Sequence, residues 1–381
     1  MLTRRTMIQA GAVSLGALAA GCATTEAPPP GPTYPARSLN RDVMEVVAEM
    51  RAIGQNLRAT NPEARYYRLP DAAFTEPLAY AGQPIAAGNH YPATNCSTAC
   101  FEAFVRTLNR VEARQGGVYE KLSFDDLAGR RGYPLRSWMM RTKSFDRAIG
   151  AASPKFRSMV GPADGFVLYG IGDIIDFPNA APGDFVQFHR WTQAANGEMQ
   201  KYNQGHAVIF TGFLDATRNE AGASVITPAT RYNAATNCGF TYFSSNGPTN
   251  GLADRYAFFY GKKPDDAMSA EPWDRNVQEP TSRDDLYALS IARAYEPALW
   301  RREATSLRID AYISGQSIFA LETENRLYAD RSYDPRFENT VMAAADMDET
   351  TLAERAARDA VLETAFQAEI ASITPMYNME E

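Results

Sequence analysis

The stretch 182–213, PGDFVQFHRWTQAANGEMQKYNQGHAVIFTGF, contains the strongest fold signal in this chain of 381 residues. Residues 184–190 alternate apolar and polar side chains, and residues 206–213 form an apolar run rich in β-branched and aromatic side chains. Each pattern predicts a β-strand, with His206 at the first position of the second, buried strand. An imidazole placed there can face a cleft. The predicted bends before the two strands are Pro182-Gly183 and Asn203-Gln204-Gly205.

Upstream of this stretch, residues 95–113 predict an amphipathic helix that begins at a cysteine. Asn95 is a good N-cap, so Cys96 falls at the first helical position. The partial positive charge and the N–H groups of a helix N-terminus favour a thiolate over a thiol and can hold an oxyanion. Cys100, one turn further on, is interpreted as a small buried hydrophobe. The apolar positions are Phe101, Phe104, Val105, Leu108 and Val111.

Residues 40–262 are expected to form one domain, and the rest of this range predicts a mixture of helix, strand and loop. Residues 40–59 have a helical period, with Asn40 available as N-cap, and residues 63–94 are interpreted as irregular structure. Residues 214–236 predict a long loop or a hairpin insertion. Two further strands are expected at 239–245, before the turn Asn246-Gly247-Pro248, and at 254–260.

Beyond residue 262 the composition changes, and a charged, proline-containing segment suggests a domain boundary. We expect helices at 282–299, 309–328 and 351–373, the last opened by a capping-box spacing. Residues 263–381 are therefore expected to be a helical accessory region.

Residues 1–22 have the form of an export signal. Arg4-Arg5 precedes a short apolar segment and resembles a twin-arginine signal, and Leu18 to Cys22 resembles a lipoprotein lipobox with Cys22 as the lipidated residue. A plain secretory signal cut nearby is the alternative, and either one implies export to the cell envelope. Residues 23–39, rich in Pro, Thr and Ala, are expected to act as a tether.

Composition excludes several classes of function. Apolar residues make up 45% of the chain and charged residues 22%, which are ordinary globular values. The net charge of −7, with no run of basic and aromatic residues, argues against nucleic-acid binding. Four cysteines are too few for a disulfide scaffold, and their spacing does not fit a zinc site. We expect no metal and no organic cofactor.

A cysteine at a helix start, a histidine at a strand start and a polar residue on a later strand form a thiol-hydrolase arrangement. The motifs resemble those of the NlpC/P60 superfamily of papain-like cysteine peptidases and amidases. Asn95-Cys96-Ser97 is similar to its D/N-C-S helix start, residues 182–185 (PGDF) to its P-G-D strand, and residues 205–209 (GHAVI) to its G-H strand. The resemblance covers roughly residues 90–260. It implies an α+β papain-like fold and cleavage of an amide or peptide bond in cell-wall peptidoglycan.

Two departures from the family pattern affect the site. The family's third residue usually follows the histidine by about a dozen positions, but a long insertion intervenes here. By its place on the next strand, Asn246 is chosen as the orienting residue, with Ser245 as the alternate. Thr98 stands where the family has a small residue. The implied roles are nucleophile for Cys96 and general base and acid for His206.

Several alternatives stay open at this point. Cys96 could be structural, paired with Cys100 or Cys238, whereas a Cys100–Cys238 bridge would leave Cys96 available. His206 could be a satisfied core histidine, and Asn246 only a turn residue. Acyl transfer would use the same three residues as hydrolysis. A non-catalytic envelope protein could bind wall peptides or a partner through the same cleft.

The other polar residues near these motifs receive structural interpretations. His189 is expected on the surface or lining the cleft, and His90 in a loop before Cys96. Glu102 is expected to point to a different face of the helix from Cys96 and to be structural. The prediction as a whole is an exported thiol hydrolase of α+β fold, in contact with a membrane only through a lipid anchor on Cys22.

Overall fold

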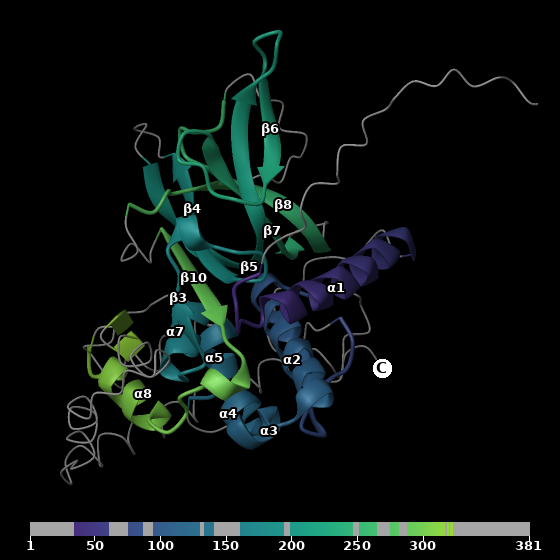
Figure 1. Cartoon of the computed structure of the whole chain (residues 1–381), viewed down its shortest axis with the longest axis vertical. Coiled ribbons are helices and arrows are strands. Elements are labelled where there is room, and N and C mark those ends of the chain that lie inside the picture. The colour runs from purple at the N-terminus through teal and green to yellow at the C-terminus, as the bar shows by residue number, and fades with distance from the viewer. Residues whose placement is uncertain are drawn as a thin grey trace, which may run out of the picture. The chain divides into compact units, whose positions relative to one another are not determined.

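The computed structural model describes most of residues 34–322 and shows a mixed α+β unit (Figure 1). The described ranges are 34–60, 75–86, 94–129, 133–140, 161–193, 199–246, 251–264, 275–281, 288–316, 318–319 and 321–322. The export signal with Cys22, the tether up to residue 33, His90 and the helix expected at 351–373 lie outside the described residues.

One sheet of eight strands holds this unit together, in the order β3-β10-β4-β9-β8-β7-β5-β6. Neighbouring strands are antiparallel except for the parallel pair β8–β9. An additional pairing of β4 with β5 closes β4, β9, β8, β7 and β5 into a barrel. The bounds are β3 Gly172–Ile174, β4 Phe185–Gln193, β5 Met199–Arg218, β6 Ser224–Ala229, β7 Asn237–Asn246, β8 Gly251–Phe259, β9 Arg275–Val277 and β10 Leu289–Ala294.

Alternate residues of the barrel strands fill its interior. Val186, Val208, Phe210 and Phe240 belong to one buried cluster there. Phe177, from the 3-10 turn Phe177–Asn179, completes this core: its ring lies 4.9 Å from that of Phe259 and 5.4 Å from that of Phe213.

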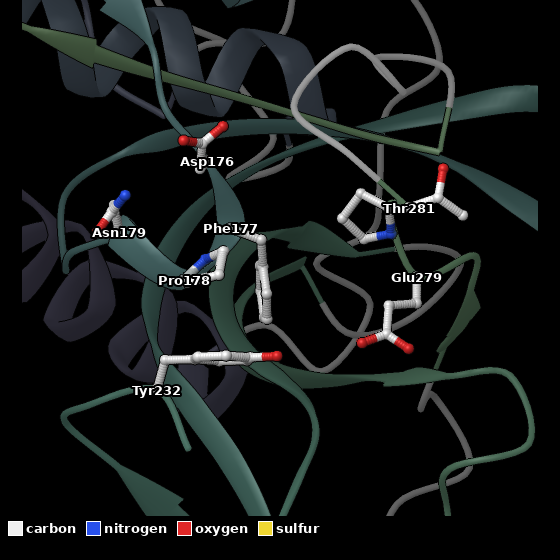
Figure 2. Close-up of a pocket in the computed structure, with 8 residues that line it drawn as sticks. Asp176, Phe177, Pro178, Asn179, Tyr232, Glu279 and Thr281 are labelled. Atoms are coloured by element: carbon white, nitrogen blue, oxygen red, sulfur yellow. The ribbon is translucent and has the colours of Figure 1, made fainter. Parts of the chain in front are cut away.

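A pocket of about 310 Å³ lies beside Phe177. Figure 2 shows Tyr232 and Glu279 arranged around this phenylalanine. The ring of Phe177 also contacts Phe210, which lies four residues along β5 from His206. His206 is not among the residues that line the pocket.

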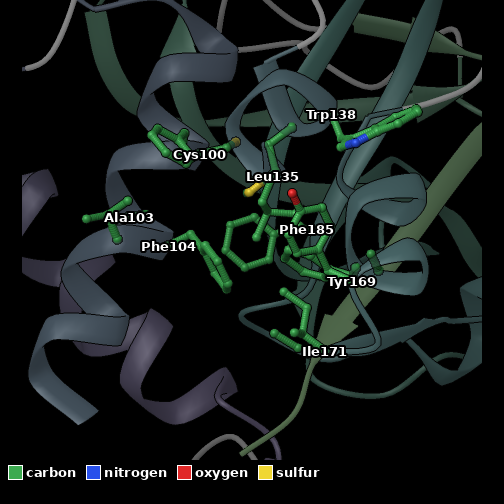
Figure 3. Packing of buried hydrophobic residues seen from close by; sticks show 14 of the residues in the cluster. Cys100, Ala103, Phe104, Leu135, Trp138, Tyr169, Ile171 and Phe185 are labelled. Atoms are coloured by element: carbon green, nitrogen blue, oxygen red, sulfur yellow. The ribbon is translucent and has the colours of Figure 1, made fainter. Parts of the chain in front are cut away.

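The helices pack against this sheet through a second core, part of which is shown in Figure 3. The rings of Phe104, Phe166 and Phe185 meet there at centroid distances of 5.1 to 5.8 Å. The helices are α1 Asn40–Thr60, α2 Cys96–Gln115, α3 Val118–Lys121, α4 Phe124–Ala128, α5 Leu135–Met140, α7 Pro162–Leu168 and α8 Thr305–Ile313. Among the predicted elements, α1 and α2 are confirmed, and the five apolar positions expected on α2 are all buried.

Asp184 of the Pro-Gly-Asp turn joins three parts of the fold. Its buried carboxylate pairs with Arg293 of β10 at 2.7 Å and accepts a hydrogen bond of 2.8 Å from the Asn40 side-chain amide. Asn40 is therefore not the N-cap of α1, because its side chain is bound to this turn and the Leu39 carbonyl begins the helix. Gly183 has φ of 97°, and a Cβ there would lie 2.6 Å from the Asn40 carbonyl oxygen. The turn thus requires glycine.

The strands predicted from 182–213 are present, but the second is longer than expected. β5 begins at Met199, so His206 is not the first residue of its strand. The regular pairing of β5 with β4 is interrupted between Lys201 and Gly205, where the bend Asn203-Gln204-Gly205 is predicted. The start of this strand is predicted too late because the residues before Gly205 are mostly polar and lack the alternation of apolar side chains that indicates a strand. They nevertheless pair with β4. The strands expected at 239–245 and 254–260 are confirmed as β7 and β8.

Residues 214–236 take the hairpin alternative, since β5 continues to Arg218 and pairs with β6. The interpretation of 63–94 as irregular is wrong in part, because β1 Leu78–Tyr80 and β2 Gln83–Ala86 form a short hairpin.

The helix expected at 282–299 is wrong, because β10 lies there and pairs with both β3 and β4. Residues 289–292 pair with residues 185–188 of β4, and this pairing with a distant segment favours strand over helix. The helix expected at 309–328 is interrupted: α8 begins at Thr305 and ends at Ile313, and residues 318, 319, 321 and 322 are helical again. Residues 323–328 lie outside the described part of the chain. β9 and β10 follow residue 262, the predicted domain boundary, and both pair with strands that precede it.

Candidate functional site

The structure places His206 and Asn246 in direct contact. Nε2 of His206 lies 3.1 Å from Oδ1 of Asn246, and both residues are only 1% exposed. The contact follows from strand register, because β5 and β7 are antiparallel with Ile209 opposite Phe243, which brings His206 level with Asn246. Two of the predicted site residues are therefore adjacent across the sheet.

The hydrogen bonds of Asn246 determine which tautomer of His206 this contact requires. The Asn246 side-chain nitrogen donates to the carbonyl oxygens of Ser244, at 3.0 Å, and Ala253, at 3.4 Å. Its oxygen therefore faces the imidazole and needs a donor, so Nε2 of His206 carries the proton. In the neutral ring the lone pair is then on Nδ1, the nitrogen able to act as a base.

Two aromatic rings hold the imidazole on its sides. The rings of Phe188 and Tyr242 lie 5.4 and 5.6 Å from the His206 ring, each edge to face. The Tyr242 hydroxyl lies 3.4 Å from Oδ1 of Asn246, the same oxygen that accepts from His206. These contacts restrict the rotation of the imidazole and shield its hydrogen bond from water.

Cys96 is the first residue of α2, as predicted, and is 8% exposed. Asn95 has extended backbone angles and caps the helix, since its side-chain oxygen accepts from the Thr98 N–H at 2.9 Å and the Ser97 hydroxyl at 3.0 Å. The first turn has no acidic side chain. The helix dipole can therefore act on the Cys96 sulfur without a competing negative charge in that turn.

The other two described cysteines are chemically different from Cys96. None of Cys96, Cys100 and Cys238 forms a disulfide, so the bridges considered from the sequence are absent. Burial, and after it the nearby Cys96 sulfur, raises the pKa of the Cys100 thiol well above its ordinary value. Burial also raises the pKa of Cys238 to about 11. Both thiols are therefore held in the unreactive protonated form.

Hydrogen bonds tie the beginning of α2 to the strand that carries Asn246. The Ser245 hydroxyl donates to the carbonyl oxygen of Thr94, two residues before Cys96. The Ser244 hydroxyl donates to the Ala207 carbonyl oxygen at 2.8 Å, which links β7 to β5 beside His206. The Ser245 hydroxyl is thus bound to the lead-in to α2, and of the two candidate orienting residues it is Asn246 that contacts the His206 ring.

Glu102 and Thr98, also singled out in the sequence, lie in the protein core. Glu102 is fully buried, pairs with Arg106 at 2.8 Å and accepts from the Thr75 N–H at 3.0 Å, as a structural residue would. Thr98 is fully buried, and its hydroxyl has no hydrogen-bond partner among the described residues. His189 pairs through its backbone with Gly205.

Sequence reasoning missed Tyr242 and Ser244 as members of the site. The signal was present in the alternation of residues 239–245, because Tyr242, Ser244 and Asn246 are spaced by two residues along one strand. The pocket beside Phe177 is lined by none of Cys96, His206 and Asn246.

The part of the chain that the structure describes has no group of acidic, histidine and cysteine side chains able to hold a metal ion. None of its helices combines the length and the apolar character needed to cross a bilayer. Comparison of the chain with protein-family models, with curated proteins and with solved structures finds no match.

Proposed function

We propose that this chain is an exported cysteine hydrolase of papain-like fold that cleaves an amide or peptide bond. The observation that carries the proposal is the buried hydrogen bond of 3.1 Å between His206 and Asn246. It orients the imidazole and leaves Nδ1 as the basic nitrogen, which is what a thiol hydrolase requires of its histidine. Cys96 at the capped start of α2 supplies the nucleophilic sulfur beside the N–H groups of a helix N-terminus.

In the first half of the reaction, Nδ1 of His206 takes the proton of the Cys96 thiol as the sulfur attacks the substrate carbonyl carbon. Backbone N–H groups at the start of α2 stabilise the resulting oxyanion. The imidazolium then gives its proton to the leaving amine as the C–N bond breaks, which leaves a thioester on Cys96. Asn246 keeps the ring in one tautomer throughout.

In the second half, His206 takes a proton from water, and the hydroxide attacks the thioester carbonyl. The C–S bond breaks, the proton returns to the sulfur, and the acid product leaves. An amine in place of water would give acyl transfer through the same steps. No metal or organic cofactor takes part in this scheme.

The proposed substrate is a peptide of cell-wall peptidoglycan. The support is the resemblance of the Asn-Cys-Ser, Pro-Gly-Asp and Gly-His motifs to NlpC/P60 enzymes, together with the twin-arginine and lipobox-like features of residues 1–22. A lipid on Cys22 would hold the enzyme at a membrane of the envelope, where the wall is within reach.

The test is to incubate the purified protein with peptidoglycan fragments and to detect newly released amino groups by mass spectrometry. We expect release by the wild type and none by Cys96→Ala, because the nucleophile is gone. Cys238→Ala removes a buried thiol elsewhere and serves as the matched control. Equal release by wild type and Cys96→Ala would sink the proposal. Binding of fragments without any turnover would instead support the non-catalytic envelope protein.

A further inference from the structure

The Ser244-Ser245-Asn246 triplet at the end of β7 contacts three different parts of the site. Asn246 contacts His206, Ser244 bonds the Ala207 carbonyl on β5, and Ser245 bonds the Thr94 carbonyl before α2. All three side chains are at most 1% exposed. The end of this one strand thus contacts both the histidine strand and the lead-in to the cysteine helix.

We propose that Ser245 is a positioning residue, which sets where Cys96 stands relative to the His206–Asn246 pair. This inference rests on the proposed function. Ser245 is next to Asn246 in the chain. The hydrogen bond from its hydroxyl to the Thr94 carbonyl oxygen therefore fixes the start of α2 against the same strand that orients the imidazole. Proton transfer and thiolate attack depend steeply on such placement, since a displacement of about 1 Å can cost about a hundredfold in rate.

The lead-in to α2 is fixed on two sides. From within the helix, Asn95 caps the first turn through Thr98 and Ser97. From the sheet, the Ser245 hydroxyl donates a hydrogen bond to the carbonyl oxygen of Thr94, a residue that is 1% exposed. Removing the Ser245 hydroxyl would leave that buried carbonyl oxygen without its donor, and relaxation of the backbone would move Cys96.

The readout is the rate at which iodoacetamide alkylates Cys96 in the full chain, measured from pH 5 to pH 9. Cys100 and Cys238 are buried with raised pKa values, so they react slowly, and Cys96→Ala gives the background. For wild type we expect fast labelling at neutral pH. For Ser245→Ala we expect about a tenfold slower rate at neutral pH, because the sulfur is displaced from the His206 ring.

A matched control separates positioning from a general loss of stability. Thr107→Val removes another fully buried hydroxyl that donates to a carbonyl, that of Ala103 at 2.8 Å, further along the same helix. We expect it to lose comparable stability by thermal unfolding and to keep the wild-type labelling rate. Ser245→Thr and Ser245→Val form a second pair that differs only by the hydroxyl. The threonine variant should label faster, and this pair decides the question if Ser245→Ala does not fold.

His206→Ala distinguishes the two proposals. If it leaves labelling of Cys96 unchanged, the proposed function itself fails. If His206→Ala slows the labelling of Cys96, the proposed function stands. The positioning role of Ser245 is then overturned if Ser245→Ala labels at the same rate as Thr107→Val, or if Ser245→Thr and Ser245→Val label at equal rates.

Discussion

At the scale of single residues, the site is defined by which hydrogen bonds each polar side chain already makes. The side-chain nitrogen of Asn246 donates a hydrogen bond to the Ser244 carbonyl oxygen, so the side-chain oxygen of Asn246 faces His206. The Ser245 hydroxyl donates a hydrogen bond to the Thr94 carbonyl oxygen. Of the two candidates for the orienting residue, Asn246 therefore contacts His206, whereas Ser245 contacts the lead-in to α2.

Truncation of Asn246 should impair catalysis more than loss of the Tyr242 hydroxyl. We expect Asn246→Ala to lower kcat on the order of 10–100-fold, because the imidazole loses its tautomer and its orientation. Tyr242→Phe keeps the ring against His206 and removes only a contact of 3.4 Å, so we expect a fall of a few fold. Steady-state kinetics on the released amine provide the measurement.

Tyr256→Phe is the control for this comparison, since Tyr256 lies on β8 with its ring against Phe258. Its kcat should equal that of the wild type. A full wild-type kcat in Asn246→Ala would contradict the assignment of Asn246.

At the scale of secondary-structure elements, the Pro-Gly-Asp turn acts as a junction between α1, β4 and β10. The Asp184 side chain is 0% exposed, and that of its partner Arg293 is 11% exposed. A carboxylate taken out of water is tolerated only when its charge and lone pairs are satisfied. Arg293, the Asn40 amide and the Ala181 N–H satisfy it here.

Removal of the arginine should therefore be costly. We expect Arg293→Met to lower the free energy of unfolding by about 3–5 kcal/mol, because Asp184 would stay buried without its counter-charge. Arg51→Met is the matched control: its pair with Asp254 is 2.6 Å long, but the two side chains are 31% and 42% exposed, so we expect a loss of about 0–1 kcal/mol. Urea unfolding followed by circular dichroism measures both. Equal losses would show that Asp184 is not a buried charge that depends on Arg293.

The elements that the sequence predicts well are those whose side chains carry the signal themselves. The period of α2 and the apolar run of β5 after His206 were enough to place both elements. β10 was missed because LSIARA is short and compatible with a helix, and what makes it a strand is pairing with β4, about 100 positions earlier in the chain. Polar residues 199–205 were missed for the same reason. Tertiary pairing overrides local propensity at such sites.

The same contrast holds for the candidate site. Cys96 and His206 could be found because short motifs surround them. Asn246 could be ranked only by its place on a strand, since the β5–β6 hairpin separates it from His206 by 40 positions. Tyr242 and Ser244 act through ring packing and a backbone carbonyl, and their trace in the sequence is only the spacing of two residues along the strand that ends at Asn246.

At the scale of the whole molecule, residues beyond 262 complete the sheet. β10 pairs with residues 185–188 of β4, and β9 joins β4 to β8 where the barrel closes. Further along, the Glu322 carboxylate accepts a hydrogen bond of 2.5 Å from the Ile174 N–H of β3. The residues that carry His206 and Asn246 therefore share one sheet with the later part of the chain.

A chain that ends at residue 262 should for this reason fail to fold cooperatively. It would expose one edge of β4, leave the barrel open between β4 and β8, and bury Asp184 without Arg293. We expect the full chain to show one sharp thermal transition and near-ultraviolet circular dichroism, and the shortened chain to show neither and to aggregate. A soluble shortened chain with a sharp transition and fast Cys96 labelling would mean that the barrel and the site form without β9 and β10.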